Sequence, residues 1–260
     1  MESLIAVLID VCMIFFFVRM FVAESERLHP VFGMVFRVTD YVIGPLQALL
    51  PGRRATLPCG LVIVALLLLK GFVLGSISET VHSFASMLLT VYVLIIIIIA
   101  GFREHYTNPF TSFGQRVVNP IRAIAANFSR RLVMVNILSI VILVLLHSFV
   151  TLALAALEGG GLPSIKAAIV GSPPDFGSLG LIVGLTGWFI FFIFVNAMLS
   201  WVSPDPSNPI VQLLALISAP IVDPIRRYMP QLPIDISPLI AIFALYIIKD
   251  VGYSLLSALQ

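Results

Sequence analysis

The chain has 260 residues, of which 60% are hydrophobic and 11% are charged, and its formal net charge is +2. A soluble domain usually carries about 25% charged residues, and one of this length cannot bury so much apolar surface. The composition therefore excludes an ordinary soluble protein, gives no indication of nucleic-acid binding, and indicates an all-α protein embedded in lipid.

Six apolar runs are long enough to cross a bilayer as helices, for which about 20 residues are needed. In chain order they are Leu4–Ala23, Leu57–Ser76, Val81–Phe102, Leu132–Leu157, Leu179–Val202 and Ile236–Leu256. The segment Gly75-Ser76-Ile77-Ser78 suits a tight turn between the second and third runs. We therefore predict a polytopic membrane protein with six transmembrane helices.

The connecting loops alternate in charge along the chain. The loops after the first, third and fifth runs hold eleven arginines: Arg27, Arg37, Arg53, Arg54, Arg103, Arg116, Arg122, Arg130, Arg131, Arg226 and Arg227. The loops after the second and fourth runs together hold only Lys166. Because basic loops stay on the cytoplasmic side, we predict that both termini face outward.

An internal repeat is visible in the positions of prolines and one lysine. Four residues recur at a constant offset of 179, namely Pro30, Pro45, Pro51 and Lys70 as Pro209, Pro224, Pro230 and Lys249. Each repeat is a span, a basic loop and a second span. We predict three units in one orientation: a first repeat at 1–78, a divergent middle helix pair at 79–158 and a third unit at 178–260.

The basic loop of the third unit carries the signals of a short helix. Asn208 suits a helix cap and Pro209 the first helical position, and apolar residues then recur at helical spacing. We expect Pro220 and Pro224 to break this helix, and Arg226-Arg227 to lie among lipid phosphates at the membrane surface.

The third unit resembles the YggT (YlmG) family of small membrane proteins, whose repeat has the order S-W, N-P-I, P, P-x-R-R, P and D-x-S-P. The residues that carry the resemblance are Ser200, Trp201, Asn208, Pro209, Pro220, Pro224, Arg226, Arg227, Pro230, Asp235, Ser237 and Pro238. In the family an arginine commonly precedes the Ser-Trp pair by four residues, whereas this chain has Asn196. The first unit, near residues 1–75, is similar to a lesser degree.

The resemblance implies an integral protein of bacterial inner membranes or plastids. Relatives are associated with cell division and membrane organisation, with assembly of a photosynthetic cytochrome complex, and with tolerance of osmotic stress.

Charged residues inside the apolar runs are candidates for function by default. Asp10, Lys70, Lys249 and Asp250 all fall in the half of the membrane away from the basic loops. We predict that Asp10 pairs with Lys70. Such a cluster can serve ion conduction, or it can be a structural pairing with lysines that reach the interface. Arg19 lies near the basic end of its run, where the same snorkelling is expected.

The sequence contains no constellation typical of an enzyme, and no metal or cofactor motif. Among the histidines, we expect His147 to form hydrogen bonds between helices. The preferred interpretation is a non-enzymatic scaffold or assembly factor that binds anionic lipid headgroups, a protein partner or further copies of itself. Its candidate binding residues are Arg53, Arg54, Arg122, Arg226 and Arg227. The alternative is an ion or small-solute channel or transporter, although Val91–Ile99 is almost entirely apolar.

Overall fold

A computed structural model of the chain describes residues 2–49, 55–101, 109–158, 164–171, 177–202, 205, 208–229 and 235–260. Within these ranges the chain is all-helical. The elements are α1 (Glu2–Phe21), η1 (Glu24–Glu26), α2 (Pro30–Leu49), α3 (Thr56–Leu74), α4 (Ile77–Gly101), α5 (Pro109–Ala126), α6 (Leu132–Leu157), α7 (Ile165–Val170), α8 (Gly177–Val202), α9 (Pro209–Tyr228) and α10 (Ser237–Leu259).

The six predicted spans correspond to α1, α3, α4, α6, α8 and α10. Each is long and apolar enough to cross a membrane, and so is α9, which makes seven candidate spans among the described helices. The mean hydropathy of α9 is 1.4, against 1.8 to 2.7 for the other six. The chain is therefore a multi-pass membrane protein, and α9 is the candidate by which the count of seven exceeds the predicted six.

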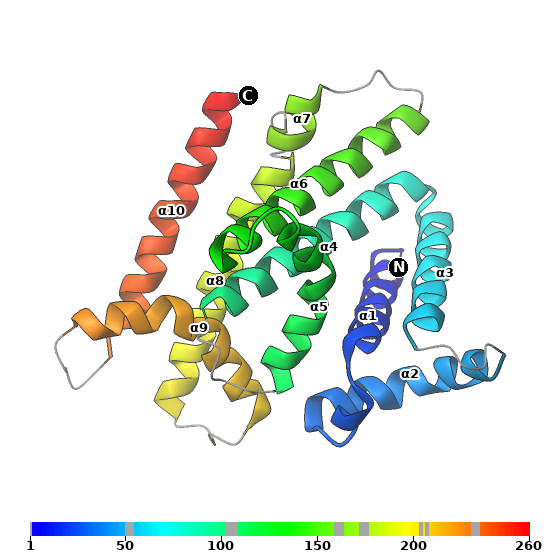
Figure 1. Ribbon diagram of the computed structural model, residues 1–260, viewed down its shortest axis with the longest axis horizontal. Helices are drawn as coiled ribbons and strands as arrows, with labels where there is room; N and C mark the ends of the chain where they lie inside the picture. Colours follow the sequence, from blue (N-terminus) through cyan, green and yellow to red (C-terminus); the bar gives the residue numbers. More distant parts are fainter. Residues whose placement is uncertain are drawn as a thin grey trace. The chain divides into compact units, whose positions relative to one another are not determined.

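The expectation that Pro220 and Pro224 end the third-unit helix is wrong. Both prolines lie inside α9, which continues to Tyr228. A proline removes one backbone hydrogen bond and bends a helix, but packing of the flanking turns can hold it together. Leu214, Ile217 and Val222 on both sides of Pro220 are buried, and Figure 1 shows that α9 bends along its length.

The turn between the second and third spans is tighter than the predicted boundaries imply. Gly75 ends α3 in the left-handed region, with φ of 71°, where glycine is favoured. The Ser76 hydroxyl then accepts a hydrogen bond from the Glu79 backbone N–H at 3.2 Å. This cap allows α4 to begin at Ile77, four residues before the apolar run itself.

The chain separates into two compact units, residues 1–84 and 85–260. In the first unit α1 packs along α3, and α2 contacts both helices and lies across their ends (Figure 1). Its core contains Phe16, Ile43, Cys59 and Ile63. The residues of α2 that face this core recur at helical spacing because α2 is amphipathic, with Thr39 and Ile43 fully buried.

The second unit takes in the predicted middle and third units together. One cluster in its core joins α4, α5, α6 and α8 through Leu89, Val93, Ile96, Val118, Leu143 and Leu185. A second cluster joins α8, α9 and α10 through Phe189, Ile193, Ile217, Val222, Ala241 and Leu245. Helix α9 crosses the foot of α10 (Figure 1). This arrangement sets the basic end of α9 beside the first residues of α10.

Candidate functional site

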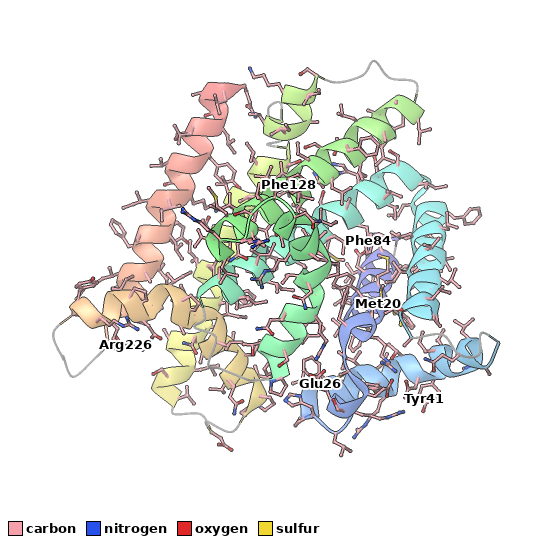
Figure 2. All side chains as sticks on the ribbon, in the orientation of Figure 1. Met20, Glu26, Tyr41, Phe84, Phe128 and Arg226 are labelled. Atoms are coloured by element: carbon pink, nitrogen blue, oxygen red, sulfur yellow. The ribbon has the colours of Figure 1, made fainter. Side chains whose placement is uncertain are left out.

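The end of α9 is tied to the beginning of α10 by the side chain of Arg226. Its Nε and Nη2 donate to one oxygen of Asp235 at 2.9 and 2.7 Å, and Nη1 donates to Asp223 at 2.9 Å. Figure 2 shows Arg226 on α9 near the foot of α10. The sequence had placed Arg226 among lipid phosphates, but two carboxylates of the same chain already hold its guanidinium.

Asp235 also contacts the first turn of α10. Its other oxygen accepts the backbone N–H of Ser237, the first residue of the helix, at 2.9 Å. Partial burial raises the pKa of Asp235, but hydrogen bonds from Ser237 and Arg226 outweigh it, so the pKa lies below its ordinary value. The carboxylate is therefore ionised at neutral pH and holds two structural contacts at once.

The remaining motif residues are placed as follows. The Asn208 side chain accepts the Ile210 backbone N–H at 2.9 Å and caps α9, with Pro209 in the first turn, so both predictions are confirmed. Ser200 is exposed on α8, and Pro238 lies in the first turn of α10. The Trp201 side chain and Pro230 lie outside the described residues.

Arg227 differs from its neighbour Arg226. Its side chain is exposed, and the described part of the chain provides no ion-pair or hydrogen-bond partner for it. Tyr228, 91% exposed, follows directly. Arg37 of α2 is also exposed, one turn before Tyr41, which is 86% exposed, but it lies in the first half of its helix and not in the last turn. Arg122 is half-buried on α5, whereas Arg53 and Arg54 lie outside the described residues.

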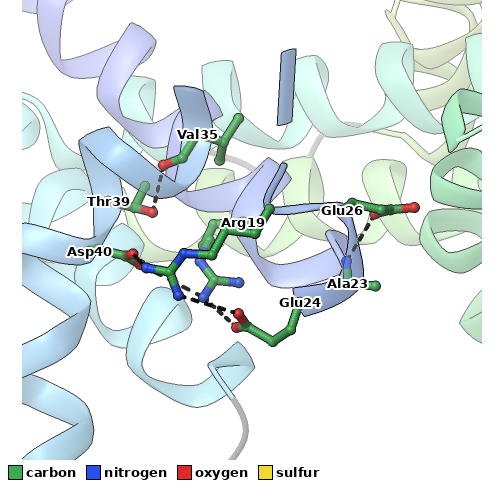
Figure 3. Close-up of polar contacts among 8 residues, drawn as sticks. Arg19, Ala23, Glu24, Glu26, Val35, Thr39 and Asp40 are labelled. Atoms are coloured by element: carbon green, nitrogen blue, oxygen red, sulfur yellow. Dashed lines mark hydrogen bonds and ion pairs between the residues drawn. The ribbon is translucent and has the colours of Figure 1, made fainter. Parts of the chain in front are cut away.

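Arg19 is buried, contrary to the snorkelling expected from the sequence, and only 4% of it is exposed. Its Nη2 lies 2.8 Å from Glu24 and 3.8 Å from Asp40, and its guanidinium stacks 3.9 Å from the centre of the Phe36 ring. Figure 3 shows Arg19 between these two carboxylates. Arg27 also pairs with Asp40. The acids compensate the cations, so this cluster joins α1 to α2 and leaves little charge for a ligand.

The predicted pairing of Asp10 with Lys70 is confirmed. The Lys70 ammonium lies 2.6 and 2.8 Å from the two oxygens of Asp10, which connects α3 to α1 inside the first unit. Lys249 and Asp250 belong to α10 in the second unit. Within the described residues of that unit, neither of their side chains has an ion-pair partner.

A buried polar cluster surrounds His147 of α6. Its Nε2 lies 3.0 Å from the Ser86 hydroxyl of α4, and its Nδ1 lies 2.8 Å from the Ser178 hydroxyl of α8. The expected hydrogen bonds between helices are confirmed. The two serines give weak sequence signals, because Ser86 lies within an otherwise apolar run and Ser178 directly precedes one, so the cluster emerges only from helix packing. Among the described residues no group of three metal-ligating side chains occurs.

Comparison with known proteins places these features in a family. The sequence model of the CCB3/YggT family matches residues 177–256, which span α8, α9 and α10. An uncharacterized protein of Pseudomonas aeruginosa is 29% identical over 179 residues, which are 65% of this chain and 86% of the relative. The uncharacterized protein YggT of Escherichia coli is 32% identical over 154 residues, 55% of this chain and 72% of that protein.

An uncharacterized protein of Vibrio alginolyticus is 29% identical over 171 residues, which are 62% of this chain and 86% of that protein. No solved structure matches the chain. The family match and the similarity to the Escherichia coli relative identify the family, and the apolar helices fit a membrane protein. The chain belongs to the YggT family of multi-pass membrane proteins.

Proposed function

We propose that this protein is a non-enzymatic membrane scaffold whose working surface is formed by the exposed cations of the helices that lie across the ends of its spans. The observation that carries the proposal is Arg227, which is exposed at the last turn of α9 beside an exposed tyrosine and has no acidic partner in the described chain. The ligand class is the anionic lipid headgroup.

The amphipathic character of α9 supports this surface. One face, with Leu214, Ile217 and Val222, is buried against α8 and α10. Its last turn carries Arg226 and Arg227, whose charges also suit the negative end of the helix dipole. Arg226 forms ion pairs with Asp223 and Asp235, and Arg227 directly follows it in the same helical turn. One such charge near an anionic surface contributes about 1 kcal/mol.

Helix α2 offers another exposed arginine in the first unit, although not in its last turn. Its buried face covers the ends of α1 and α3, and its other face exposes Arg37 and Tyr41 together with Met34 and Val38. Apolar and aromatic residues beside an arginine are typical of helices that lie in the lipid interface. Two units of the chain thus offer the same kind of surface, as expected for a protein that organises lipids around itself.

The spans themselves favour a scaffold over a channel. Helices α6 and α8 contain no charged residue, and two of their polar side chains, His147 and Ser178, bond to each other between the helices. We place the protein in a bacterial inner membrane with the basic helices on the cytoplasmic side. Among the roles that the family resemblance implies, cell division and assembly of membrane complexes both require such an organising surface.

The proposal is tested by the lipid that stays bound. Wild type, Arg37→Gln, Arg227→Gln and the double variant are extracted gently from membranes containing phosphatidylglycerol and phosphatidylethanolamine, and retained lipid is quantified by mass spectrometry. Lys166→Gln is the matched control, because it removes one positive charge from α7, away from this surface. We expect the ratio of phosphatidylglycerol to phosphatidylethanolamine to fall in the Arg variants and to stay unchanged in the control.

Salt provides a second criterion, because exposed charge contacts are screened as ionic strength rises. The difference between wild type and the double variant should shrink from low to high salt. An unchanged lipid ratio in the double variant at low salt contradicts the proposal. If in that case an acidic protein partner is lost from the double variant in cells, the surface serves a protein instead of a lipid.

A further inference from the structure

We propose that the protein forms a parallel homodimer through the exposed face of α10, in which Asp250 of each copy pairs with Lys249 of the other. This inference is independent of the lipid-binding surface. That surface lies near the first residues of α10, whereas Lys249 and Asp250 lie in the second half of the same helix. It starts from Lys249 and Asp250, two charged residues of a spanning helix whose side chains have no ion-pair partner among the described residues of the second unit.

The exposed face of α10 carries a line of polar residues that begins one turn after Phe243. Phe243 and the polar residues Tyr246, Asp250, Ser254 and Ser257 are exposed and follow one another at steps of three or four residues, so they share one side of the helix. The opposite side is covered by α8. A Cβ on Gly252, two residues after Asp250, would lie 2.9 Å from the Val183 side chain. The polar line therefore points away from the unit's own core.

Asp250 has no route to water from this position by snorkelling. It lies nine residues before Leu259, the last residue of α10, which is about 14 Å along the helix axis. A lysine reaches toward the interface with its long stem, but the short aspartate side chain cannot cover that distance. An ionised carboxylate facing lipid tails is costly, so charged residues in spans normally meet a partner.

The rest of the second unit supplies no such partner in its spans. Helices α6 and α8 contain no charged residue, and neither does the part of α4 that belongs to this unit. The charged residues of α9 lie at the other end of α10, where Arg226 is already bound to Asp235. In the first unit the same problem is solved internally, because Lys70 of α3 meets Asp10 of α1.

A second copy of this chain fits the face by charge complementarity. Two α10 helices related by a two-fold axis along the membrane normal run parallel, so equivalent residues lie at equal depth. Asp250 of one copy and Lys249 of its partner then differ in depth by one helical step, about 1.5 Å. The two pairs form a neutral group of four charges. Ser254 and Ser257, one and two turns further on, have the small polar side chains that favour close helix packing in membranes.

Charge reversal tests this pairing directly. Two differently tagged full-length copies are expressed together in bacterial membranes, and capture of one tag by the other is quantified after mild solubilisation. K249D makes the four-charge group wholly acidic and D250K makes it wholly basic, so each variant should capture itself about tenfold less than wild type does. A mixed pair of K249D with D250K regains complementary charges and should recover most of the wild-type capture.

Crosslinking keeps the proposal testable if the reversed variants fail to accumulate. In a background with Cys12→Ala and Cys59→Ala, Ser254→Cys places a thiol on the proposed interface, and Leu255→Cys places one a residue further on, off that face. Only Ser254→Cys should form a disulfide-linked dimer. Wild-type copies that do not capture each other, a mixed pair that is not rescued, or equal crosslinking at both positions overturns the proposal. Capture of a different protein through Ser254→Cys overturns it in favour of another partner.

Discussion

Arg226 of α9 donates hydrogen bonds to Asp235 from two nitrogens, and the same carboxylate accepts a hydrogen bond from the first residue of α10. This ion pair thus connects the end of α9 to the beginning of α10. The adjacent Arg227 makes no such contact within the described residues. Two neighbouring arginines of one motif therefore have different roles, and each makes its own prediction.

We predict that Arg226→Gln destabilises the protein and that Arg227→Gln does not. The change frees Asp223 and Asp235 from their cation, and we expect a loss of about 0.5–1 kcal/mol, because exposed ion pairs contribute little each. Thermal or denaturant unfolding in detergent measures the difference. Equal stability of the two variants would show that the ion pairs of Arg226 do not contribute to stability.

Acid should weaken the ion pair between Arg226 and Asp235. The pKa of Asp235 is lowered in the folded protein, so its contribution to stability is present above its unfolded pKa and is lost as pH falls through the lowered folded pKa. Wild type should therefore lose stability relative to Asp235→Asn between neutral pH and about pH 3, with most of the change below pH 4. Unfolding of both proteins across this range gives the test, and parallel pH curves would contradict it.

The intramembrane pair in the first unit should behave as a coupled unit. Lys70→Met leaves Asp10 without its cation, and we expect a loss of about 2 kcal/mol in stability. Adding Asp10→Asn removes the unpaired charge and should recover part of this loss. A double-mutant cycle measured by unfolding in lipid or detergent provides the coupling energy. Strictly additive losses would contradict an energetic contact between the two side chains.

The buried arginine of the first unit should not tolerate lysine. Arg19→Lys keeps the charge but loses the planar group that stacks on Phe36 while approaching both Glu24 and Asp40. We expect a loss of about 1–2 kcal/mol, since a buried pair is left with poorer geometry. Arg37→Lys on the exposed side of α2 is the control and should be neutral. If both variants unfold alike, the cluster around Arg19 does not stabilise the unit.

Both termini are predicted to face the periplasm because the arginine-rich loops all fall on the other side. Alkaline phosphatase fused after Gln260 should be active, and the same enzyme inserted in the α5–α6 connection near Ser129 should be inactive. Cytoplasmic reporters such as green fluorescent protein should give the opposite pattern. An inactive phosphatase at Gln260 would reverse the proposed orientation.

Much of the fold follows from local patterns in the chain. Long apolar runs predicted the six spans because about 20 successive apolar residues match a spanning helix, which satisfies all of its backbone hydrogen bonds within the segment. The Asn208-Pro209 start of α9 was also predictable, since capping involves residues only two or three positions apart. The common depth of Asp10 and Lys70 predicted their pairing, which required only that α1 and α3 be neighbours.

Tertiary structure decided the features that depend on which helices meet. Arg19 is buried because α2 folds back over the end of α1 and supplies Phe36 and Asp40. The continuity of α9 through Pro220 and Pro224 depends on packing against α8 and α10. The general tendency of proline to end helices does not take this packing into account. The lack of an acidic partner for Arg227 among the described residues, and the exposure of the polar side of α10, likewise depend on which helices pack together. Sequence determines the spans and their caps through local hydrogen bonding and hydrophobicity, and only packing determines which charges are left for a partner.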